Sequence, residues 1–339
     1  MKAILARPSG GFGLREVEPP PIGPGEILVE MRACGLCGTD LAKLAKPEQA
    51  QGVSLGHELA GVVREVGAGP IGFAPGERVT AAHHVPCGDC WACRHGSESM
   101  CPQFKATNIE PCGFAELIRI PRLHVEKVTI RLPEDMPFDV ASFTEPLACA
   151  VRAVQRSAVL PGDRIAVIGG GGMGLLIAQV VASREAIPAV VDISEDRLAL
   201  ARSLGLERTV NPLREDLRGV VAEVTSGVGL DGAILTVLNQ PILVQVQEVL
   251  RPGARINIFA GPTDGSHLGV DFADLYHREL SMFSTYSSTP QALAEAFELL
   301  AGKRIQVLPM ISHHLPLAAF DEGVELQRTG KAMKVIFHP

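Results

Sequence analysis

The strongest constraint on the fold is a glycine-rich run, Gly169-Gly170-Gly171-Gly172-Met173-Gly174, which lies between two apolar segments. The first segment, residues 164–168, has the length of a buried strand, and the second, which ends at Ser183, has the length of a helix. The pattern G-x-G-x-x-G between a strand and a helix is typical of a dinucleotide-binding turn. Gly169 permits the tight turn, Gly171 lets the backbone approach a pyrophosphate, and Gly174 lets the helix pack closely on the strand.

A nicotinamide dinucleotide is the cofactor that this loop predicts. The start of the helix offers the N–H groups and the positive dipole end that bind phosphates, which places Gly172 and Met173 in the binding loop. Asp192 ends the next expected strand, where its carboxylate can accept hydrogen bonds from ribose hydroxyls and repel a 2′-phosphate. We therefore expect NAD rather than NADP, although Ser194 and Arg197 could weaken that preference. A purely structural glycine turn is the alternative.

The chain divides into two kinds of sequence. Its first 148 residues contain short β-type runs separated by Gly and Pro, which favours an irregular, barrel-like β domain. From 149 to 288, β-rich runs alternate with helical stretches, which indicates βαβ units and a parallel sheet. Residues 289–339 return to short β runs after one helix. We expect an α/β fold in which a doubly wound cofactor domain, 149–288, is inserted between the two parts of a mostly β domain, 1–148 and 289–339.

Charge and length exclude several classes of protein. The 339 residues carry a formal net charge of -7, which argues against a nucleic-acid or anionic-membrane partner. The uncharged stretch at 165–183 is near the length of a membrane span, but its glycines suit a strand, a turn and a helix better. No apolar signal segment precedes Pro8, so we expect a cytoplasmic protein.

Four cysteines lie within fifteen residues, at Cys87, Cys90, Cys93 and Cys101. Four thiolates at this spacing suit a closed tetrahedral site of the kind that holds structural zinc. The surrounding segment, about 84–104, is rich in Gly and charged residues, which predicts an exposed lobe clamped by the metal. An iron–sulfur cluster is the main rival, whereas the absence of a basic stripe argues against a nucleic-acid-binding ribbon.

Further motifs are spread over both expected domains: Pro24-Gly25-Glu26, Gly56-His57-Glu58, Gly76-Glu77-Arg78-Val79, Gly113-Phe114-Ala115-Glu116, Thr144-Glu145-Pro146-Leu147-Ala148-Cys149, Arg251-Pro252-Gly253, and Ser287-Ser288-Thr289-Pro290. Together with the four-cysteine lobe and the glycine run, their order along the whole chain resembles the medium-chain, zinc-dependent alcohol and polyol dehydrogenases, in particular the sorbitol- and threonine-dehydrogenase-like branch. The resemblance implies a catalytic domain of the GroES-like fold and a Rossmann cofactor domain.

The resemblance also implies a second, catalytic zinc. Cys37, rather than Cys34, matches the first ligand and His57 the second, while Glu145 stands where polyol dehydrogenases carry a glutamate ligand. Glu58 matches a carboxylate that in this family can move onto the metal. Asp40 resembles the acid that orients the imidazole ligand. The alternative for Glu145 is a structural residue at the start of a helix.

The implied reaction is hydride transfer between a zinc-bound alkoxide and the nicotinamide, with Thr39 passing the proton toward solvent. Ala42 replaces a relay histidine of many relatives, and Lys43 replaces a substrate-site tyrosine of sorbitol dehydrogenases. We expect a secondary alcohol, a polyol or sugar alcohol, to be oxidised to its ketone by a chain that binds NAD and two zinc ions. An L-threonine-type 3-dehydrogenase and a polyol-phosphate dehydrogenase, the latter suggested by Lys43 and Lys46, are the alternatives.

Two rival functions remain open. A zinc-free quinone oxidoreductase would share the fold but not the Cys37, His57 and Glu145 set. A non-catalytic binding protein could also retain the fold. The resemblance further implies a homo-oligomer, either a tetramer or a dimer. The histidine pairs His83-His84 and His313-His314 are expected to be structural, because the sequence offers no third ligand for either pair.

Overall fold

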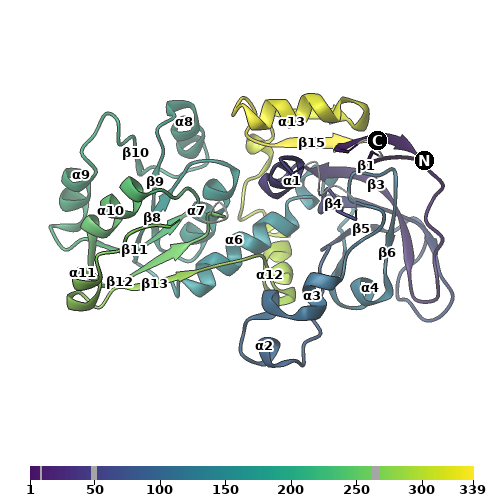
Figure 1. The fold of residues 1–339 in the computed structure, drawn as a ribbon, viewed down its shortest axis with the longest axis horizontal. Helices are drawn as coiled ribbons and strands as arrows, with labels where there is room; N and C mark the ends of the chain where they lie inside the picture. Colours follow the sequence, from purple (N-terminus) through teal and green to yellow (C-terminus); the bar gives the residue numbers. More distant parts are fainter. Residues whose placement is uncertain (8–9, 47–51, 262–266) are drawn as a thin grey trace. The chain divides into compact units, whose positions relative to one another are not determined.

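The computed structural model describes residues 1–7, 10–46, 52–261 and 267–339, and these form two compact units (Figure 1). Unit 1 comprises Met1–Ala148, Ser288–Lys303 and Met310–Pro339, and unit 2 comprises Cys149–Ser287 and Arg304–Pro309. The short segment 304–309 joins unit 2 because the side-chain amide of Gln179 donates to the carbonyl of Gln306 at 3.1 Å and accepts from its N–H at 2.8 Å.

Unit 2 is built on a six-stranded sheet among its described residues, and every strand pair in it is parallel. The spatial order is β10-β9-β8-β11-β12-β13. Numbered from β8, that order is 3-2-1-4-5-6, in which the chain reverses direction across the sheet between β8 and β11. The strands are β8 (Arg164–Ile168), β9 (Ile187–Val191), β10 (Thr209–Val210), β11 (Leu230–Leu235), β12 (Leu250–Ile258) and β13 (Ser281–Ser284).

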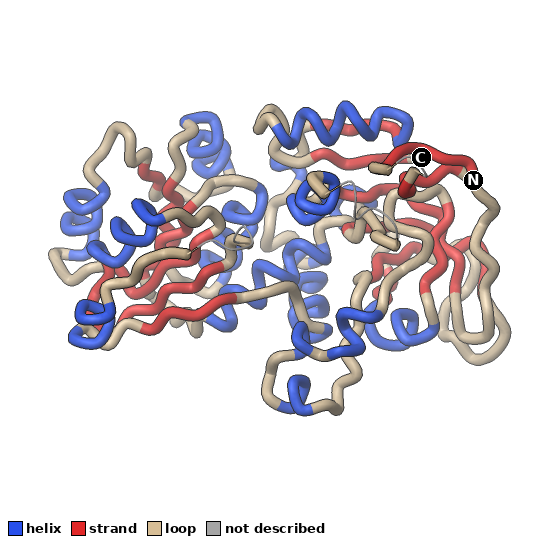
Figure 2. The backbone as a smooth tube through the Cα atoms, viewed as in Figure 1, coloured by secondary structure: helices blue, strands red, loops and turns tan. Residues whose placement is uncertain are grey.

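Helices flank this sheet, as the tube view shows (Figure 2). Leu217 and Val221 of α9 and Val246 of α10 pack in one apolar core with β-strand residues such as Ile168 and Leu235. Near-continuous apolar runs such as that of β8 are typical of strands covered on both faces. The helices of unit 2 are α7 (Gly172–Ser183), α8 (Glu195–Ser203), α9 (Leu217–Thr225), α10 (Gln240–Val249) and α11 (Phe272–His277), and α6 (Thr144–Arg156) runs across the boundary from unit 1.

Unit 1 contains a seven-stranded mixed sheet and a separate hairpin among its described residues. The sheet has the order β14-β15-β3-β4-β5-β7, and β6 also pairs with β3, so the C-terminal strands pair with an N-terminal one. Its strands are β3 (Ile27–Gly35), β4 (Glu58–Val66), β5 (Arg78–Ala81), β6 (Leu117–Ile120), β7 (Thr129–Arg131), β14 (His313–Pro316) and β15 (Val335–His338), and the hairpin is β1 (Lys2–Ala6) with β2 (Phe12–Glu16).

The core of unit 1 joins segments from both ends of the chain. The rings of Phe114, Phe320 and Phe337 contact one another with centroids 5.3 to 5.4 Å apart, and all three are buried. The C-terminal strand β14 joins the sheet by pairing with β15. The helices of unit 1 are α1 (Gly38–Leu44), α2 (Trp91–Arg94), α3 (Pro102–Ala106), α4 (Arg122–Val128), α5 (Phe138–Ala141), α12 (Pro290–Ala301) and α13 (Phe320–Arg328).

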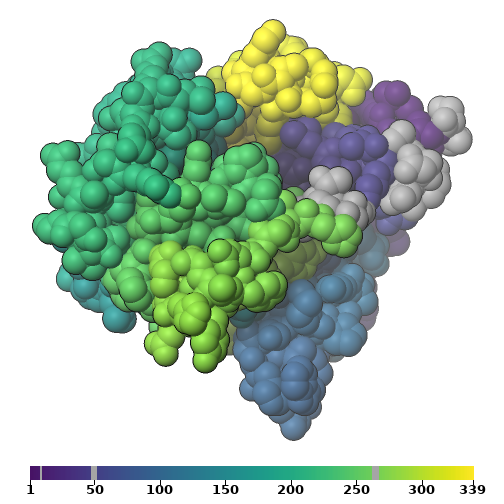
Figure 3. Space-filling view, turned by 60° about the vertical axis from the view of Figure 1, so that its left-hand side comes forward, coloured from purple at the N-terminus to yellow at the C-terminus, as the bar shows by residue number. Residues whose placement is uncertain are grey.

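A lobe around α2, coloured blue in Figure 3, projects from unit 1. Trp91 at the start of α2 is 74% exposed and stacks on His95 rather than packing in a core. A small exposed lobe without a substantial apolar core needs another source of stability, such as a bound metal.

No helix in the described ranges combines the length and the apolar content that a membrane crossing requires.

Candidate metal and cofactor sites

The lobe brings the four cysteines of the sequence cluster together. The sulfur of Cys87 lies 3.9 Å from that of Cys93 and 3.6 Å from that of Cys101, and Cys90 lies 3.6 Å from Cys93. Four sulfurs bound to one zinc at about 2.3 Å would be about 3.8 Å apart. None of the four forms a disulfide. The spacing therefore fits a tetrahedral zinc held by four thiolates.

Backbone N–H groups favour the ionised form of the Cys87 sulfur. The N–H groups of Asp89 and Cys90 donate to Sγ of Cys87 at 3.4 and 3.2 Å, and these hydrogen bonds lower the pKa of that thiol. The thiolate is the form of cysteine that binds a metal. The loop conformation thus prepares Cys87 as a ligand.

A second cluster in unit 1 contains Cys37, His57 and Glu58, whose ligand atoms lie within 4.8 Å of one another. Cys37 caps the N-terminus of α1, while Glu58 begins β4 and His57 immediately precedes it. His57 and Glu58 are buried, and Cys37 is half-buried. A thiolate, an imidazole and a carboxylate are the donor types found in zinc sites, so this donor set also fits zinc.

Asp40 holds together the two segments that carry the residues of this cluster. It is fully buried, and its two oxygens accept the N–H of Cys37 at 3.1 Å and the N–H of Gly56 at 2.9 Å. Oδ1 of Asp40 also lies 3.6 Å from Nδ1 of His57, which leaves Nε2 of the ring for a metal. One buried carboxylate therefore holds both of the segments that carry ligands.

The pKa shifts of Asp40 and His57 follow from their burial and their proximity to each other. Burial alone would raise the pKa of Asp40, but the neighbouring His57 and the donated N–H groups outweigh it and lower the pKa. Burial would lower the pKa of His57, but the charges of Asp40 and Cys37 raise it well above its ordinary value. Without a metal, the imidazole therefore holds a proton that a zinc ion must displace.

Glu58 has a partner that the sequence did not indicate. The ammonium of Lys334, just before β15, forms an ion pair with the Glu58 carboxylate and donates to the carbonyl of Leu36 at 3.1 Å. Both side chains are buried. Burial would lower the pKa of Lys334, but the Glu58 charge outweighs it and raises the pKa. Glu58 and Lys334 are 276 positions apart in the sequence, so no local pattern could pair them.

Three further residues, Glu145, Thr39 and His83, lie outside the group formed by Cys37, His57 and Glu58. Glu145 is the second residue of α6 and is buried, but it is not a member of the group formed by Cys37, His57 and Glu58. Thr39 is exposed in the first turn of α1, and its N–H donates to Sγ of Cys37 at 3.5 Å. The ring of His83 lies 4.6 Å from that of His57, a contact that the sequence did not single out.

In unit 2, the glycine run forms the turn between β8 and α7. Gly169 has φ +101°, a conformation that side chains rarely tolerate, and a Cβ on Gly174 would clash with the carbonyl of Gly169. A Cβ on Gly171 would meet nothing within 4 Å. The N–H groups of Gly172, Met173 and Gly174 precede the first hydrogen bond of the helix, so they remain available to an anion.

Asp192 closes this loop from the end of β9. Its Oδ2 accepts the N–H of Gly170 at 2.6 Å and lies 3.4 Å from a guanidinium nitrogen of Arg197, while Oδ1 accepts the N–H of Ser194 at 2.8 Å. The guanidinium is partly exposed. A negative and a positive group thus lie together at the position where a ribose hydroxyl or a 2′-phosphate would be recognised.

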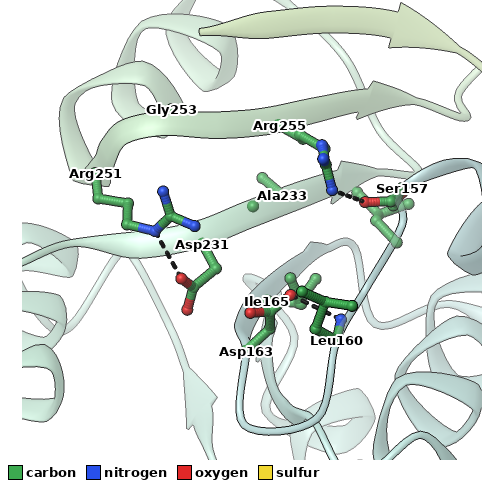
Figure 4. A pocket seen from close by; sticks show the side chains of 11 residues that line it. Ser157, Leu160, Asp163, Ile165, Asp231, Ala233, Arg251, Gly253 and Arg255 are labelled. Atoms are coloured by element: carbon green, nitrogen blue, oxygen red, sulfur yellow. Dashed lines mark hydrogen bonds and ion pairs between the residues drawn. The ribbon is translucent and has the colours of Figure 1, made fainter. Parts of the chain in front are cut away.

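A pocket also lies at the amino ends of the strands of the parallel sheet (Figure 4). It is lined by residues at the starts of β8, β11 and β12, including Asp231, Arg251 and Arg255. Arg251 pairs with Asp231 at 2.7 Å, and Arg255 donates to the carbonyls of Ser157 and Ala158. Ligands of such sheets bind outside the carboxyl ends of the strands, so this pocket is not the cofactor site.

Known proteins match both halves of the chain. Residues 23–131 match the alcohol dehydrogenase GroES-like domain, and residues 172–302 match the zinc-binding dehydrogenase family. L-threonine 3-dehydrogenase of Pyrococcus furiosus is 33% identical over 99% of this chain and 98% of its own length.

Solved structures are similar to this chain over its whole length. A putative zinc-binding dehydrogenase from Sinorhizobium meliloti, bound to NADP, is 27% identical with a TM-score of 0.89, covering 100% of this chain and 99% of its own. Galactitol-1-phosphate dehydrogenase from Escherichia coli is 26% identical with a TM-score of 0.87, covering 100% of both chains.

These matches confirm the predicted fold class, a Rossmann sheet combined with a GroES-like domain. They also make the protein an oxidoreductase of the zinc-binding dehydrogenase type. The chain belongs to the zinc-dependent medium-chain dehydrogenase/reductase family.

Proposed function

We propose that the protein is an NAD-dependent dehydrogenase that interconverts a secondary alcohol, a polyol or sugar alcohol, and its ketone. The observation that carries this proposal is the buried grouping of Cys37, His57 and Glu58 around Asp40. Ligands of this kind, unlike the residues of a closed four-cysteine site, can leave a metal position open to substrate.

Cys37 and His57 would hold the catalytic zinc together with a carboxylate, Glu145 or Glu58, and Cys87, Cys90, Cys93 and Cys101 would hold the structural one. A catalytic zinc lowers the pKa of a bound hydroxyl and polarises the corresponding carbonyl. Asp40 positions the ligand segments through the N–H groups of Cys37 and Gly56. The ion pair with Lys334 balances the charge of Glu58 when that carboxylate is not a ligand.

Thr39 is our candidate for proton release. Its exposed position beside Cys37 would let its hydroxyl accept the proton of the substrate alcohol and pass it to solvent. Ala42, one turn along α1, has no group to extend this relay, so water would take the proton from Thr39.

NAD is the cofactor that we propose, held by Gly169, Gly171, Gly172, Met173, Gly174 and Asp192. The charge of Asp192 favours a free ribose hydroxyl over a 2′-phosphate. Arg197 acts in the opposite direction, and the related Sinorhizobium meliloti structure contains NADP. We therefore expect a preference for NAD rather than exclusion of NADP.

The hydrogen bonding of Lys43 bears on whether the substrate is phosphorylated. Its ammonium donates one of its three N–H groups to the carbonyl of Ser54 at 2.8 Å, a contact that gives Lys43 a structural role in unit 1. We therefore propose an unphosphorylated polyol as the substrate and keep a polyol phosphate as the alternative. L-threonine is a second candidate, because the curated relative from Pyrococcus furiosus is an L-threonine 3-dehydrogenase.

We further propose that the enzyme works in the cytoplasm as a homo-oligomer, a tetramer or a dimer. Thiolate ligands such as Cys87 remain available to metal in a reducing compartment, which supports the first part. Sedimentation velocity would test the second, and a monomer at micromolar concentration would contradict it.

Steady-state kinetics on a substrate panel test the proposal. The panel contains polyols, their phosphates, L-threonine and primary n-alkanols, each with NAD and with NADP. The proposal expects the highest kcat/KM for a polyol with NAD. The highest value for L-threonine would favour the second candidate, and the highest value for a primary alkanol would overturn both.

A further inference from the structure

Three side chains outside the sites described above converge at the surface of unit 1. They are Asp139 of α5, His314 of β14 and His338 of β15, which we call the surface triad. Their potential ligand atoms lie within 4.8 Å of one another. The sequence offered His314 no third ligand, because the three residues lie in distant segments that only the fold brings together.

The separations within the surface triad match those of ligands around one metal ion. Nδ1 of His314 lies 3.3 Å from Nε2 of His338. Oδ2 of Asp139 lies 3.5 Å from Nδ1 of His314, and Oδ1 of Asp139 lies 3.5 Å from Nε2 of His338. Ligands placed tetrahedrally at about 2.0–2.2 Å from a zinc-like ion would be about 3.3–3.6 Å apart. The two imidazole nitrogens and the Asp139 carboxylate are thus close enough together to ligate one ion.

A backbone carbonyl orients one of these imidazoles. Nδ1 of His338 lies 2.8 Å from the carbonyl oxygen of Arg32, which can only accept, so this nitrogen carries the proton. In a neutral ring, Nε2 then carries a lone pair, and that lone pair faces the triad. A metal-binding histidine nearly always donates its other N–H to such a partner.

The surface triad has more acceptors than donors among its own groups. With His338 in this form, its Nε2 and the Asp139 carboxylate are both acceptors, and Nδ1 of His314 offers at most one proton between them. A second proton on His338 would supply the missing donor. A divalent ion would satisfy all three groups at once.

We propose that the surface triad binds a divalent transition-metal ion of the zinc, nickel or copper class. Two imidazoles and one carboxylate favour these ions over magnesium and calcium, which prefer oxygen ligands. The side chain of His314 is 54% exposed, so an ion can enter from solvent and keep water at its remaining position. This site shares no residue with the proposed catalytic and structural zinc sites and does not depend on the proposed function.

A bound ion would tie the C-terminal strands to the rest of unit 1. Asp139 lies on a short helix far from β14 and β15 in sequence, so coordination would close large loops of chain. We expect slower hydrogen exchange at residues 313–316 and 335–338 when the ion is bound, because local opening must first release it.

Metal titration of the full chain tests this inference. Protein is first saturated with zinc and dialysed against a zinc concentration that retains only the tight sites, and Zn²⁺ is then titrated calorimetrically. The wild type should bind one further equivalent, and His314→Ala and Asp139→Asn should each lose it. His313→Ala is the matched control, because His313 lies on the same strand but contacts Ser312 rather than the surface triad.

The results separate the possible occupants. Binding that is equal in His314→Ala and the control, or no further equivalent in the wild type up to millimolar Zn²⁺, would overturn the proposal and leave a proton as the occupant. The second readout is hydrogen exchange at residues 313–316, which zinc should slow in the wild type and the control only. These readouts need no substrate turnover, so the proposed function can fail without affecting them.

Discussion

Oδ1 of Asp40 lies 3.6 Å from Nδ1 of His57, with both side chains buried, and the same carboxylate accepts the N–H groups of Cys37 and Gly56. Asp40 therefore links the segment that carries Cys37 to the segment that carries His57 and Glu58. A ligand set assembled from two strand ends and a helix start depends on such a link to keep its geometry.

Replacement of Asp40 by Asn should weaken zinc binding at the Cys37 cluster. The amide keeps the size of the side chain but removes the charge that orients His57, and loss of such a partner costs about 10–100-fold in metal affinity. The measurement is the zinc concentration that restores half of the activity of metal-stripped enzyme. Asp135→Asn, an exposed carboxylate outside the site, is the control and should leave this concentration unchanged.

Zinc binding at this cluster should depend on pH in a defined direction. The pKa of His57 in the metal-free chain is raised well above its ordinary value, so the proton must be displaced at and below neutral pH. Affinity should fall by at least about tenfold for each pH unit below that raised pKa, because His57 must lose its proton as the ion binds. Competition with a chelator between pH 6 and 9 measures this. An affinity that does not change with pH would show that His57 is not a ligand.

Lys334→Met should destabilise the fold. It leaves the buried Glu58 carboxylate without its ion-pair partner, and breaking a buried pair in this way costs about 3–5 kcal/mol. Urea unfolding measures the change, with the exposed Lys331→Met as the control at within about 0.5 kcal/mol of the wild type.

A second substitution tests the cause of that loss. The double variant Lys334→Met with Glu58→Gln removes the orphaned charge and should recover part of the stability. If the double variant is as unstable as the single one, packing rather than charge explains the effect of Lys334.

Asp192→Asn should shift cofactor preference toward NADP. The substitution removes the charge that repels a 2′-phosphate while Arg197 remains, so the ratio of kcat/KM for NAD to that for NADP should fall by about tenfold, or ~1.4 kcal/mol. Asp196→Asn is the control because its exposed carboxylate makes no contact with the glycine loop. An unchanged ratio in Asp192→Asn would place the determinant elsewhere.

The local parts of this structure followed from the sequence. The strand 164–168 and the turn at Gly169 were predicted because apolar period and glycine spacing act within a few residues. The four cysteines were grouped for the same reason, since their spacing fits one loop around one ion. The one helix predicted in 289–339 is present and begins at Pro290, with Thr289 as its N-cap.

The parts that the sequence missed depend on long-range pairing. Lys334 meets Glu58 because β15 pairs with β3, a contact between the two ends of the chain. The surface triad needs the same C-terminal strands beside α5. His83 approaches His57 through the adjacency of β4 and β5. Short-range patterns carry no information about such contacts, and in one sequence each of these residues has an ordinary structural interpretation.

Turnover of Cys37→Ser tests the central claim most directly. The account predicts that NAD reduction with the best substrate of the panel falls by at least about a hundredfold, because a zinc ligand is lost. The control is Cys34→Ala, since burial raises the pKa of Cys34 and keeps it a neutral core thiol. That variant should keep most of its turnover. Full turnover in Cys37→Ser, or equal loss in both variants, would contradict a catalytic zinc at Cys37.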